Sequence, residues 1–404
     1  MVGEVAVPVP GRGVPAAAGT SAGPGAAACA AAPAGGPDVA VDHPAAVAAL
    51  GLRDQALAAL DAGNPAAGLA LAGDALAVLS EAGLDGGPDQ AAVLVARAEI
   101  EEALDRFDAA AATIAAAIGL LGGDAGPGGE DTDLLAVWCQ AQERQAGLER
   151  LAGEYAPAAA RLHRVLAAAA AALGEASQAV VSAANALGVV HKHAGDYVAA
   201  QAAYSRAMAA VGGMAGADPL TQAALLHNLG GLAHSRGDPA AGIPLAERGR
   251  ALRTAVLGAD HPDVARDDNA LGALYHLAGR HADAGRNYWR ALAVFEDSFG
   301  PGHFEVAQAC ANLAVLHADQ EQFRSAEAAG RQALRIFETI LGPGDAETGL
   351  TMLNLAVAVA GQGRTAEASA LAERATQVLA ARLPAGHPQL DAAHATLEHL
   401  RSTS

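Results

Sequence analysis

The chain has 404 residues, of which 52% are hydrophobic but only 3% aromatic, and its formal net charge at pH 7 is −19. This acidic balance argues against sequence-independent binding of nucleic acid, because there is no basic excess to neutralise phosphates. The apolar fraction is too high for general disorder. A core with so few aromatic side chains has to be built from Ala, Leu and Val, which favours closely packed helices over sheets.

Residues 1–38 are rich in Ala, Gly and Pro and carry almost no charge, so we expect a disordered tail. The opening sequence MVGEVAVPVPGRGVP lacks both the basic segment and the unbroken apolar run of a signal peptide. The Ala-rich run at 166–173 is too short to span a bilayer. We therefore expect a soluble, cytoplasmic protein with no membrane partner.

Three cysteines, Cys29, Cys139 and Cys310, lie far apart in the chain. They show neither CxxC spacing nor the Cys/His spacing of metal ligands, so the sequence supports neither a disulfide framework nor a zinc site. We interpret them as buried or incidental thiols.

Most of the chain repeats itself with a period of 42 residues. A leucine recurs at this period, a glycine fills four of the five positions eight residues later, and a small residue follows five positions beyond the glycine. Internal repeats of this length are the signature of a solenoid. The leucines are Leu187, Leu229, Leu271, Leu313 and Leu355; the turn positions are Gly195, Gly237, Gly279, Glu321 and Gly363; the small residues are Ala200, Gly242, Ala284, Ala326 and Ala368.

The register weakens towards the N-terminus, where Gly153 and Ala158 still keep it and a Gly/Asp-rich loop at 122–133 shifts it. We divide the chain into a tail at 1–38, degenerate repeats at 39–180, and regular repeats with a capping helix at 181–404. In this interpretation, residues 39 onwards form one continuous solenoid of about eight helix pairs, and the capping helix is expected at 389–401.

Each repeat is predicted to hold two helices joined by a turn. Spacings of three and four between Leu271, Leu274, Tyr275 and Ala278 predict a first helix at 264–278, which Gly279 ends as a left-handed residue. A second helix is predicted at 283–299. The recurring small residues are expected where the two helices cross, because only a small side chain fits at the closest approach.

The residues that recur with the 42-residue period resemble those of the tetratricopeptide repeat. An example is the stretch NALGVVHKHAGDYVAA, which starts at Asn185 and continues to Tyr204 and Ala207. The longer period, and the loop LGADHPDVA at 257–265 with its later copies, are similar to the kinesin-light-chain subclass, which is widespread in bacteria. The resemblance is strong over 180–388 and weak over 45–180. It implies an all-α, right-handed superhelical solenoid whose first helices line a concave groove.

No motif in the sequence is typical of catalysis. The GxxxxGK[ST] phosphate loop, the GxSxG nucleophile elbow and the HExxH metal motif are all missing, so we expect no enzyme activity, no cofactor and no metal. Four acidic residues, Asp124, Glu130, Asp131 and Asp133, lack the alternating ligand spacing of a calcium loop. We interpret them as a solvated acidic loop.

Three loop histidines, His261, His303 and His387, recur because the repeat recurs. In their turn context we expect them to form local hydrogen bonds just before a helix. Copies on successive repeats lie about 10 Å apart, so the three cannot share one metal ion. His191 occupies the aromatic packing position of its helix, and we expect it to pack there.

The resemblance implies that varied polar residues on the first helix of each pair face the groove. An Asn side chain can donate to and accept from an extended peptide at once, and Arg, Lys or His attract acidic side chains or a C-terminal carboxylate. Alternatively, some of these Asn residues form hydrogen bonds between helices. The groove candidates are Asn185, Lys192, His193, His227, Asn228, His234, Arg266, Asn269, His276, Asn312, Asp319 and Asn354.

The sequence therefore predicts a scaffold or adaptor that binds a peptide or helix of another protein, with a polar or acidic segment matching the candidates. The alternative is a regulatory sensor, whose solenoid changes shape on binding a signalling peptide or small molecule and controls a separate effector. The acidic exterior disfavours nucleic acid and anionic membranes as partners. The identity of the partner and the oligomeric state are left open.

Overall fold

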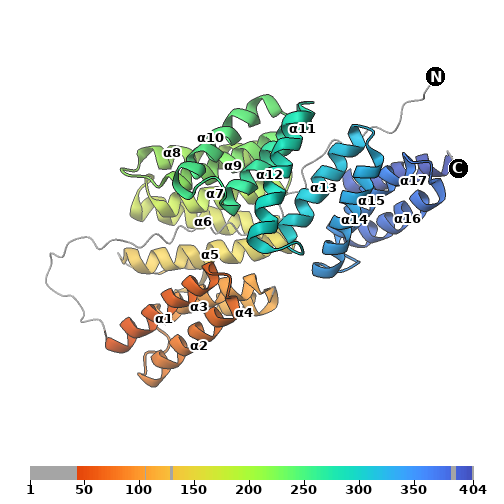
Figure 1. The fold of residues 1–404 in the computed structure, drawn as a ribbon. Helices are drawn as coiled ribbons and strands as arrows, with labels where there is room; N and C mark the ends of the chain where they lie inside the picture. The colour runs from red at the N-terminus through yellow and green to blue at the C-terminus, as the bar shows by residue number, and fades with distance from the viewer. Residues whose placement is uncertain (1–42, 105, 128–130, 384–387, 403–404) are drawn as a thin grey trace. The chain divides into compact units, whose positions relative to one another are not determined.

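The computed structural model describes residues 43–402 except 105, 128–130 and 384–387 (Figure 1). The expected tail at 1–38 lies outside the described residues, as do Cys29, Glu130 and His387. All regular structure in the described part is helical, with one 3-10 turn, η1 (Gly123–Ala125). The α-helices are α1 (Pro44–Asp61), α2 (Pro65–Glu81), α3 (Pro88–Ala103), α4 (Phe107–Leu120), α5 (Thr132–Leu151), α6 (Tyr155–Leu173), α7 (Gln178–His193), α8 (Tyr197–Gly213), α9 (Pro219–Ser235), α10 (Pro239–Leu257), α11 (Pro262–Leu277), α12 (His281–Phe299), α13 (Phe304–Asp319), α14 (Phe323–Ile340), α15 (Ala346–Ala360), α16 (Thr365–Arg382) and α17 (Pro388–Ser402).

The helices follow one another as pairs, each with an odd-numbered first helix and an even-numbered second helix. The closest packing joins the two members of a pair, as in α7 with α8 or α13 with α14. The pairs run from α1 and α2 to α15 and α16, and α17 packs on α16. The structure therefore confirms the predicted all-α solenoid of helix pairs, and α17 is the capping helix expected at 389–401.

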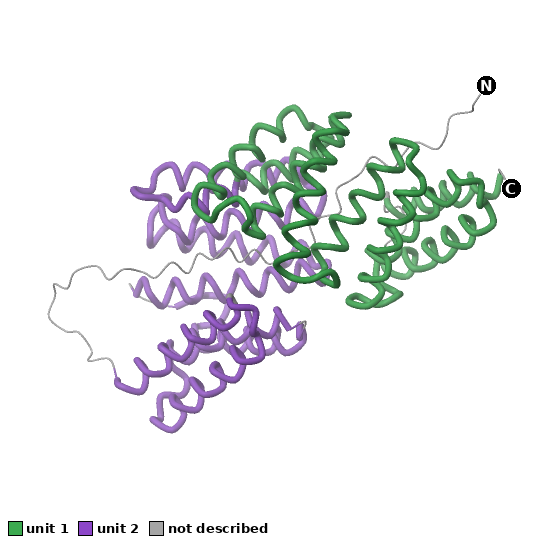
Figure 2. Tube along the Cα trace, in the orientation of Figure 1, with its two compact units in different colours: residues 1–19, 226–404 green, residues 20–225 purple. Residues whose placement is uncertain are grey.

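The described residues fall into two compact units (Figure 2). The N-terminal unit, residues 43–225, contains α1 to α8 and the start of α9, and its core includes Ile114, Trp138 and Leu162. The C-terminal unit, residues 226–402, contains the rest of α9 and α10 to α17, and its core includes Tyr288 and Phe295. The expected division at 180 concerns the regularity of the repeats and stays a prediction.

The turn inside a pair is built from a left-handed glycine followed by a capping side chain. Gly195 and Gly237 have φ of 78° and 71°, a region that glycine adopts without the strain of a Cβ. The next residue starts the second helix: the Asp196 carboxylate accepts from the Ala199 N–H at 3.0 Å, and Asp238 does the same one repeat later. A Gly-Asp dipeptide thus ends one helix and begins the next.

Small residues occupy the crossing points, as predicted. Ala200, Ala284 and Ala326 are fully buried. At the equivalent Gly242, even a Cβ would come within 2.6 Å of the Leu274 side chain. The Ala excess in the composition therefore supports close helix packing.

The first helices lie on the inner side of the curve within each unit. Successive first helices contact one another, as α3 with α5, α5 with α7, α11 with α13 and α13 with α15 do. No two successive second helices in the described part come as close along their backbones, although ion pairs between long side chains join α14 to α16. Neighbouring pairs are closer together at their first helices than at their second helices, and such pairs form a curved stack. Polar residues on the first helices of a unit therefore share one face.

Candidate functional site

Every groove candidate lies on a first helix. Lys192 and His193 are in the last turn of α7, and the others lie on α7, α9, α11, α13 and α15. Within each unit, the face formed by its first helices is called the inner face below. The structure thus places the candidates on one type of helix, and their role in binding stays a prediction.

Two pairs of candidates are brought together between α11 and α13. The Asn312 side-chain amide donates to the Asn269 side-chain oxygen at 3.0 Å. His276 Nε2 and Asp319 Oδ2 are 2.6 Å apart. These contacts link neighbouring repeats, so part of the polar side chains on the inner face holds the array together.

Other candidates also have protein partners. Arg266 bonds Glu305 of the next first helix at 2.7 Å and contacts Asp263 in its own helix. Burial disfavours the charged guanidinium, but these two carboxylates outweigh it and raise the pKa of Arg266. His227 Nδ1 lies 2.8 Å from the buried carboxylate of Asp267. Asn185, Asn228 and His234 each take part in a polar or ring interaction as well.

Lys192, His193 and Asn354 differ from these residues. The side chain of each is half-buried and makes no hydrogen bond or ion pair with any other residue that the structure describes. Burial lowers the pKa of the Lys192 ammonium. The pKa of His193 is lowered to about 4, first by burial and then by the positive charges of Arg150 and Lys192. His193 is therefore neutral at pH 7.

The loop histidines are helix caps. His261 Nδ1 accepts from the Asp263 N–H at 3.1 Å, and His303 Nδ1 accepts from the Glu305 N–H at 3.3 Å. The expected local hydrogen bonds are present for these two. No group of His, Cys, Asp and Glu side chains within the described ranges is arranged to hold a metal ion.

Cys139 and Cys310 are buried free thiols, as expected. Burial raises the pKa of each to about 12, with a smaller effect of a nearby carboxylate. Both thiols are therefore protonated at neutral pH, and a protonated thiol is not a reactive nucleophile.

The described acidic residues at the loop between α4 and α5, Asp124, Asp131 and Asp133, are exposed, as expected for a solvated loop, and two of them also bind within the protein. Asp124 accepts from Arg161 at 2.7 Å and also lies 3.3 Å from Arg164. Burial raises the pKa of Asp124, but the hydrogen bond and charge of Arg161 outweigh it and lower the pKa overall. Asp131 accepts from the Asp133 and Leu134 N–H groups and so caps α5. These carboxylates stabilise the loop and the following helix.

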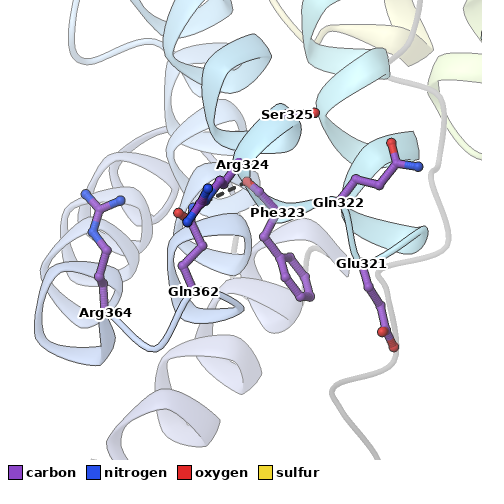
Figure 3. A pocket seen from close by; sticks show the side chains of 7 residues that line it. All are labelled: Glu321, Gln322, Phe323, Arg324, Ser325, Gln362 and Arg364. Atoms are coloured by element: carbon purple, nitrogen blue, oxygen red, sulfur yellow. Dashed lines mark hydrogen bonds between the residues drawn. The ribbon is translucent and has the colours of Figure 1, made fainter.

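A pocket of about 490 Å³ lies at the turns before α14 and α16 (Figure 3). Its Gln362 side-chain amide donates to the Phe323 carbonyl at 3.3 Å and to Glu327 Oε2 at 2.7 Å. Arg364 bonds the same Glu327 carboxylate at 2.7 Å. The hydrogen bond from Arg364, followed by that from Gln362, lowers the pKa of Glu327 to about 2. Gln362 and Arg364 therefore tie α14 to the next pair.

Sequence reasoning missed an ionic cluster that links α10, α11 and α12. The carboxylate of Asp268 is fully buried, yet it meets Arg250 of α10 and Arg290 of α12, the latter at 3.3 Å. Burial raises the pKa of Asp268 despite both arginines. The available signal was the adjacent pair Asp267–Asp268 at helix positions that are apolar in other repeats, such as Ala309 and Cys310.

None of the helices that the structure describes has the length and apolar character needed to cross a membrane.

Stacked helix pairs with small residues at each crossing define an all-α repeat protein of the solenoid class. The family model for the tetratricopeptide repeat matches residues 221–297, 268–339 and 308–381. Residues 221–381 therefore carry tetratricopeptide repeats. No curated protein sequence matches the chain.

Solved structures similar to the chain include kinesin-light-chain-like proteins. BtubC (BKLC) from P. vanneervenii shares 22% identity over 56% of this chain and 95% of its own, with a TM-score of 0.46. The kinesin light chain repeats of Podosopora anserina share 17% over 60% and 94%, with a TM-score of 0.33. A STAND signal-transduction ATPase with a tetratricopeptide repeat sensor, from Pyrococcus horikoshii, shares 12% over 78% of this chain and 49% of its own, with a TM-score of 0.50. The last likeness shows a common fold.

Proposed function

We propose that the chain is a scaffold or adaptor that binds a peptide or helix of a partner protein on the inner face. Tetratricopeptide repeats generally bind other proteins, and the finer assignment rests on one observation. Polar side chains of successive repeats lie on the first helices, which come together along the inside of each curved unit. Such a face offers donors and acceptors at regular intervals to an extended chain.

The chemistry of the inner face supports a peptide rather than a small molecule. Asn269, Asn312 and Asn354 recur on α11, α13 and α15, so amide groups are spaced along the array. The contact between Asn312 and Asn269 uses one N–H of Asn312 and one lone pair of the Asn269 oxygen, so each side chain keeps donor and acceptor capacity. We infer that these amides bind the main chain of the partner, which fixes its path without reading its sequence.

The test is selection of peptides from a displayed random library on the full chain. Selected peptides should bind the double variant Asn269→Ala, Asn312→Ala about tenfold more weakly or worse, because two hydrogen-bonding side chains are lost. Removing both members of the bonded pair leaves no orphaned amide. The matched control is Arg248→Ala with Arg335→Ala, two exposed arginines on second helices without an ion pair.

Failure to enrich any peptide, or equal binding to both double variants, would refute the assignment of the inner face. A sensor would in addition change its dimensions when the selected peptide binds, which small-angle scattering measures. Unchanged dimensions favour the scaffold.

A further inference from the structure

A second pocket lies between the second helices α10 and α12 of the C-terminal unit, away from the inner face. Its volume is about 610 Å³, which is within the range of sites for small organic molecules. This outer pocket is lined by Arg250 of α10 and by Arg286, Asn287, Trp289 and Arg290 of α12. No residue of a first helix lines it, so it is a separate feature from the groove candidates.

Beneath the outer pocket lies an ion pair that the repeat does not need for packing. Asp268 of α11 is fully buried and contacts both Arg250 and Arg290. In the two following repeats, the positions of Arg250 and Asp268 are occupied by apolar pairs that belong to the core, Leu292 with Cys310 and Leu334 with Met352. A buried ion pair is often no more stabilising than an apolar pair of similar volume. Stability alone therefore does not explain an arginine at this position.

The buried carboxylate fixes two guanidinium groups and leaves part of their N–H groups free. Arg250 contacts Asp268 through Nε, and its two Nη groups have no partner among the described residues. Arg290 lies 3.3 Å from Asp268, also through Nε, and donates from one Nη group to a backbone carbonyl at 3.1 Å. Arg286 is 70% exposed and contacts Asp283. Since a guanidinium group has five N–H donors, all three arginines keep donors for a ligand.

The side chains in contact at the outer pocket carry an excess of positive charge, although the whole chain has a net charge of −19. The carboxylates of Asp268 and Asp283 are contacted by four arginines, because Arg280 binds Asp283 as well. Glu247 of α10 acts on Arg280 from a greater distance, and one arginine is still in excess when it is counted. An anion is therefore attracted to this part of the outer surface.

A flat ring and an amide complete the outer pocket. Trp289 is 56% exposed, and its indole ring contacts no other ring or cation in the part of the chain that the structure describes. An exposed indole offers a surface on which a ring of a ligand stacks. The Asn287 amide donates to the Asp283 carbonyl at 2.8 Å, while its side-chain oxygen has no partner among the described residues. This oxygen can accept a hydrogen bond from an amino group of a ligand.

We propose that the outer pocket binds a nucleoside phosphate. Arg250, Arg286 and Arg290 bind the phosphate, whose oxygens match the paired N–H groups of a guanidinium. The base stacks on Trp289, and its amino group donates to Asn287. The amide favours a nucleobase over the phenol ring of a phosphotyrosine, which has no amino group. This function is additional to peptide binding on the inner face and does not depend on it.

A purely structural role of the same residues predicts a different outcome. In that case, the arginines only neutralise Asp268 and Asp283, and the Trp289 ring lies on the surface without a ligand. No nucleotide then changes the environment of Trp289.

The test uses the fact that the chain has two tryptophans, one in each unit. The full chain labelled with fluorotryptophan gives two fluorine NMR signals, and Trp289→Phe identifies which of them belongs to Trp289. The signal of the buried Trp138 is the internal control. Four compounds are titrated at constant ionic strength: adenosine monophosphate, adenosine, ribose phosphate, and an acetylated Ala-phosphotyrosine-Ala amide.

We expect a saturable shift of the Trp289 signal with adenosine monophosphate and no shift of the Trp138 signal. Adenosine and ribose phosphate should bind about tenfold more weakly or worse, because the first lacks the phosphate and the second lacks the base. The dissociation constant of adenosine monophosphate should rise about tenfold in Arg286→Gln. The control Arg335→Gln, an exposed arginine of α14 without an ion pair, should leave it unchanged.

A double variant separates binding from stability. Arg250→Leu with Asp268→Cys introduces the apolar pair of the following repeat, so the unfolding temperature should stay close to that of the wild type. The affinity for adenosine monophosphate should nevertheless fall about tenfold or more, because one of the phosphate-binding arginines and the anchor of a second are lost.

The proposal is overturned if adenosine monophosphate does not shift the Trp289 signal, or if adenosine binds equally well. Tighter binding of the phosphotyrosine peptide overturns the choice of ligand. Unchanged affinity in the folded double variant overturns the assignment of the outer pocket. If the double variant does not fold, the four compounds and Arg286→Gln still decide.

Discussion

Replacing Gly188 by alanine should destabilise the N-terminal unit, although the same exchange stabilises most helices. Gly188 lies in the middle of α7, where alanine gains about 1 kcal/mol in helix propensity. A Cβ at this position would stand 2.4 Å from Tyr204 Cε1 and 2.5 Å from Cδ1. The ring is fully buried and cannot swing into solvent.

The magnitude follows from these distances. To restore an ordinary contact, the ring has to move by about 1 Å within a packed core, where overpacking costs about 1–3 kcal/mol. We take about 3 kcal/mol because the clash involves the face of a buried ring rather than the end of a flexible chain. After the gain in propensity, the free energy of unfolding should fall by about 2 kcal/mol. For a unit of this size the unfolding temperature then drops by roughly 4–8 °C.

The assay is urea unfolding followed by tryptophan fluorescence in a Trp289→Phe background. Trp138 is then the only tryptophan and is buried in the N-terminal unit, whereas Trp289 is 56% exposed. The matched control is Gly147→Ala in α5, where nothing lies within 4 Å of the added Cβ. It should be more stable by about 1 kcal/mol. If Gly188→Ala is as stable as Gly147→Ala, the packing argument is wrong.

Four further exchanges test three other features of the fold. Glu321 adopts a left-handed φ of 59° where other repeats have glycine. Glu321→Gly should therefore add about 0.5–1 kcal/mol to the free energy of unfolding, and Gly363→Ala should remove about 1 kcal/mol. If both exchanges change the stability in the same direction in thermal unfolding, the argument from backbone strain is wrong. Burial, then the charge of Asp345, raises the pKa of Glu347 from 4.5 to about 8. The folded chain therefore keeps a proton that the unfolded chain releases, and stability falls between pH 4.5 and 8. Glu347→Gln should flatten this decline in urea titrations, and an unchanged slope would exclude Glu347 as its source. Asp268→Asn should cost about 2 kcal/mol or more, because two arginines lose their buried anion; a loss below about 0.5 kcal/mol in the same assay would mean that water replaces the carboxylate.

The repeat pattern predicted the fold because turn and crossing positions are local requirements. A left-handed turn needs Gly195 or its equivalents, and a close crossing needs Ala284 or its equivalents, whatever the rest of the chain does. The start of α11 was less predictable. The expected helix began at 264, whereas α11 begins at Pro262, since a proline is accepted in the first turn and His261 supplies the cap.

The candidate site was predictable only as far as the helix on which each residue lies. Whether Asn269 meets Asn312, or Asp319 meets His276, depends on the rotation and spacing of two helices some 40 residues apart in sequence. Asp124 shows the same limit, because its partner Arg161 is 37 residues away. Spacing within one helix indicates a face, but partners across repeats follow from packing.

The polar bonds between repeats have a consequence for how the array unfolds. Arg364 with Glu327, Arg331 with Glu367 and Arg374 with Glu338 each join neighbouring repeats, and the arginine side chains are 40–51% exposed. A repeat array melts as one body only while coupling between neighbours outweighs the differences in stability between them. Salt screens these exposed pairs, while the apolar contacts inside each pair of helices are not weakened. Raising the ionic strength should therefore weaken the ionic part of the coupling between α14 and α16 and leave the apolar part in place.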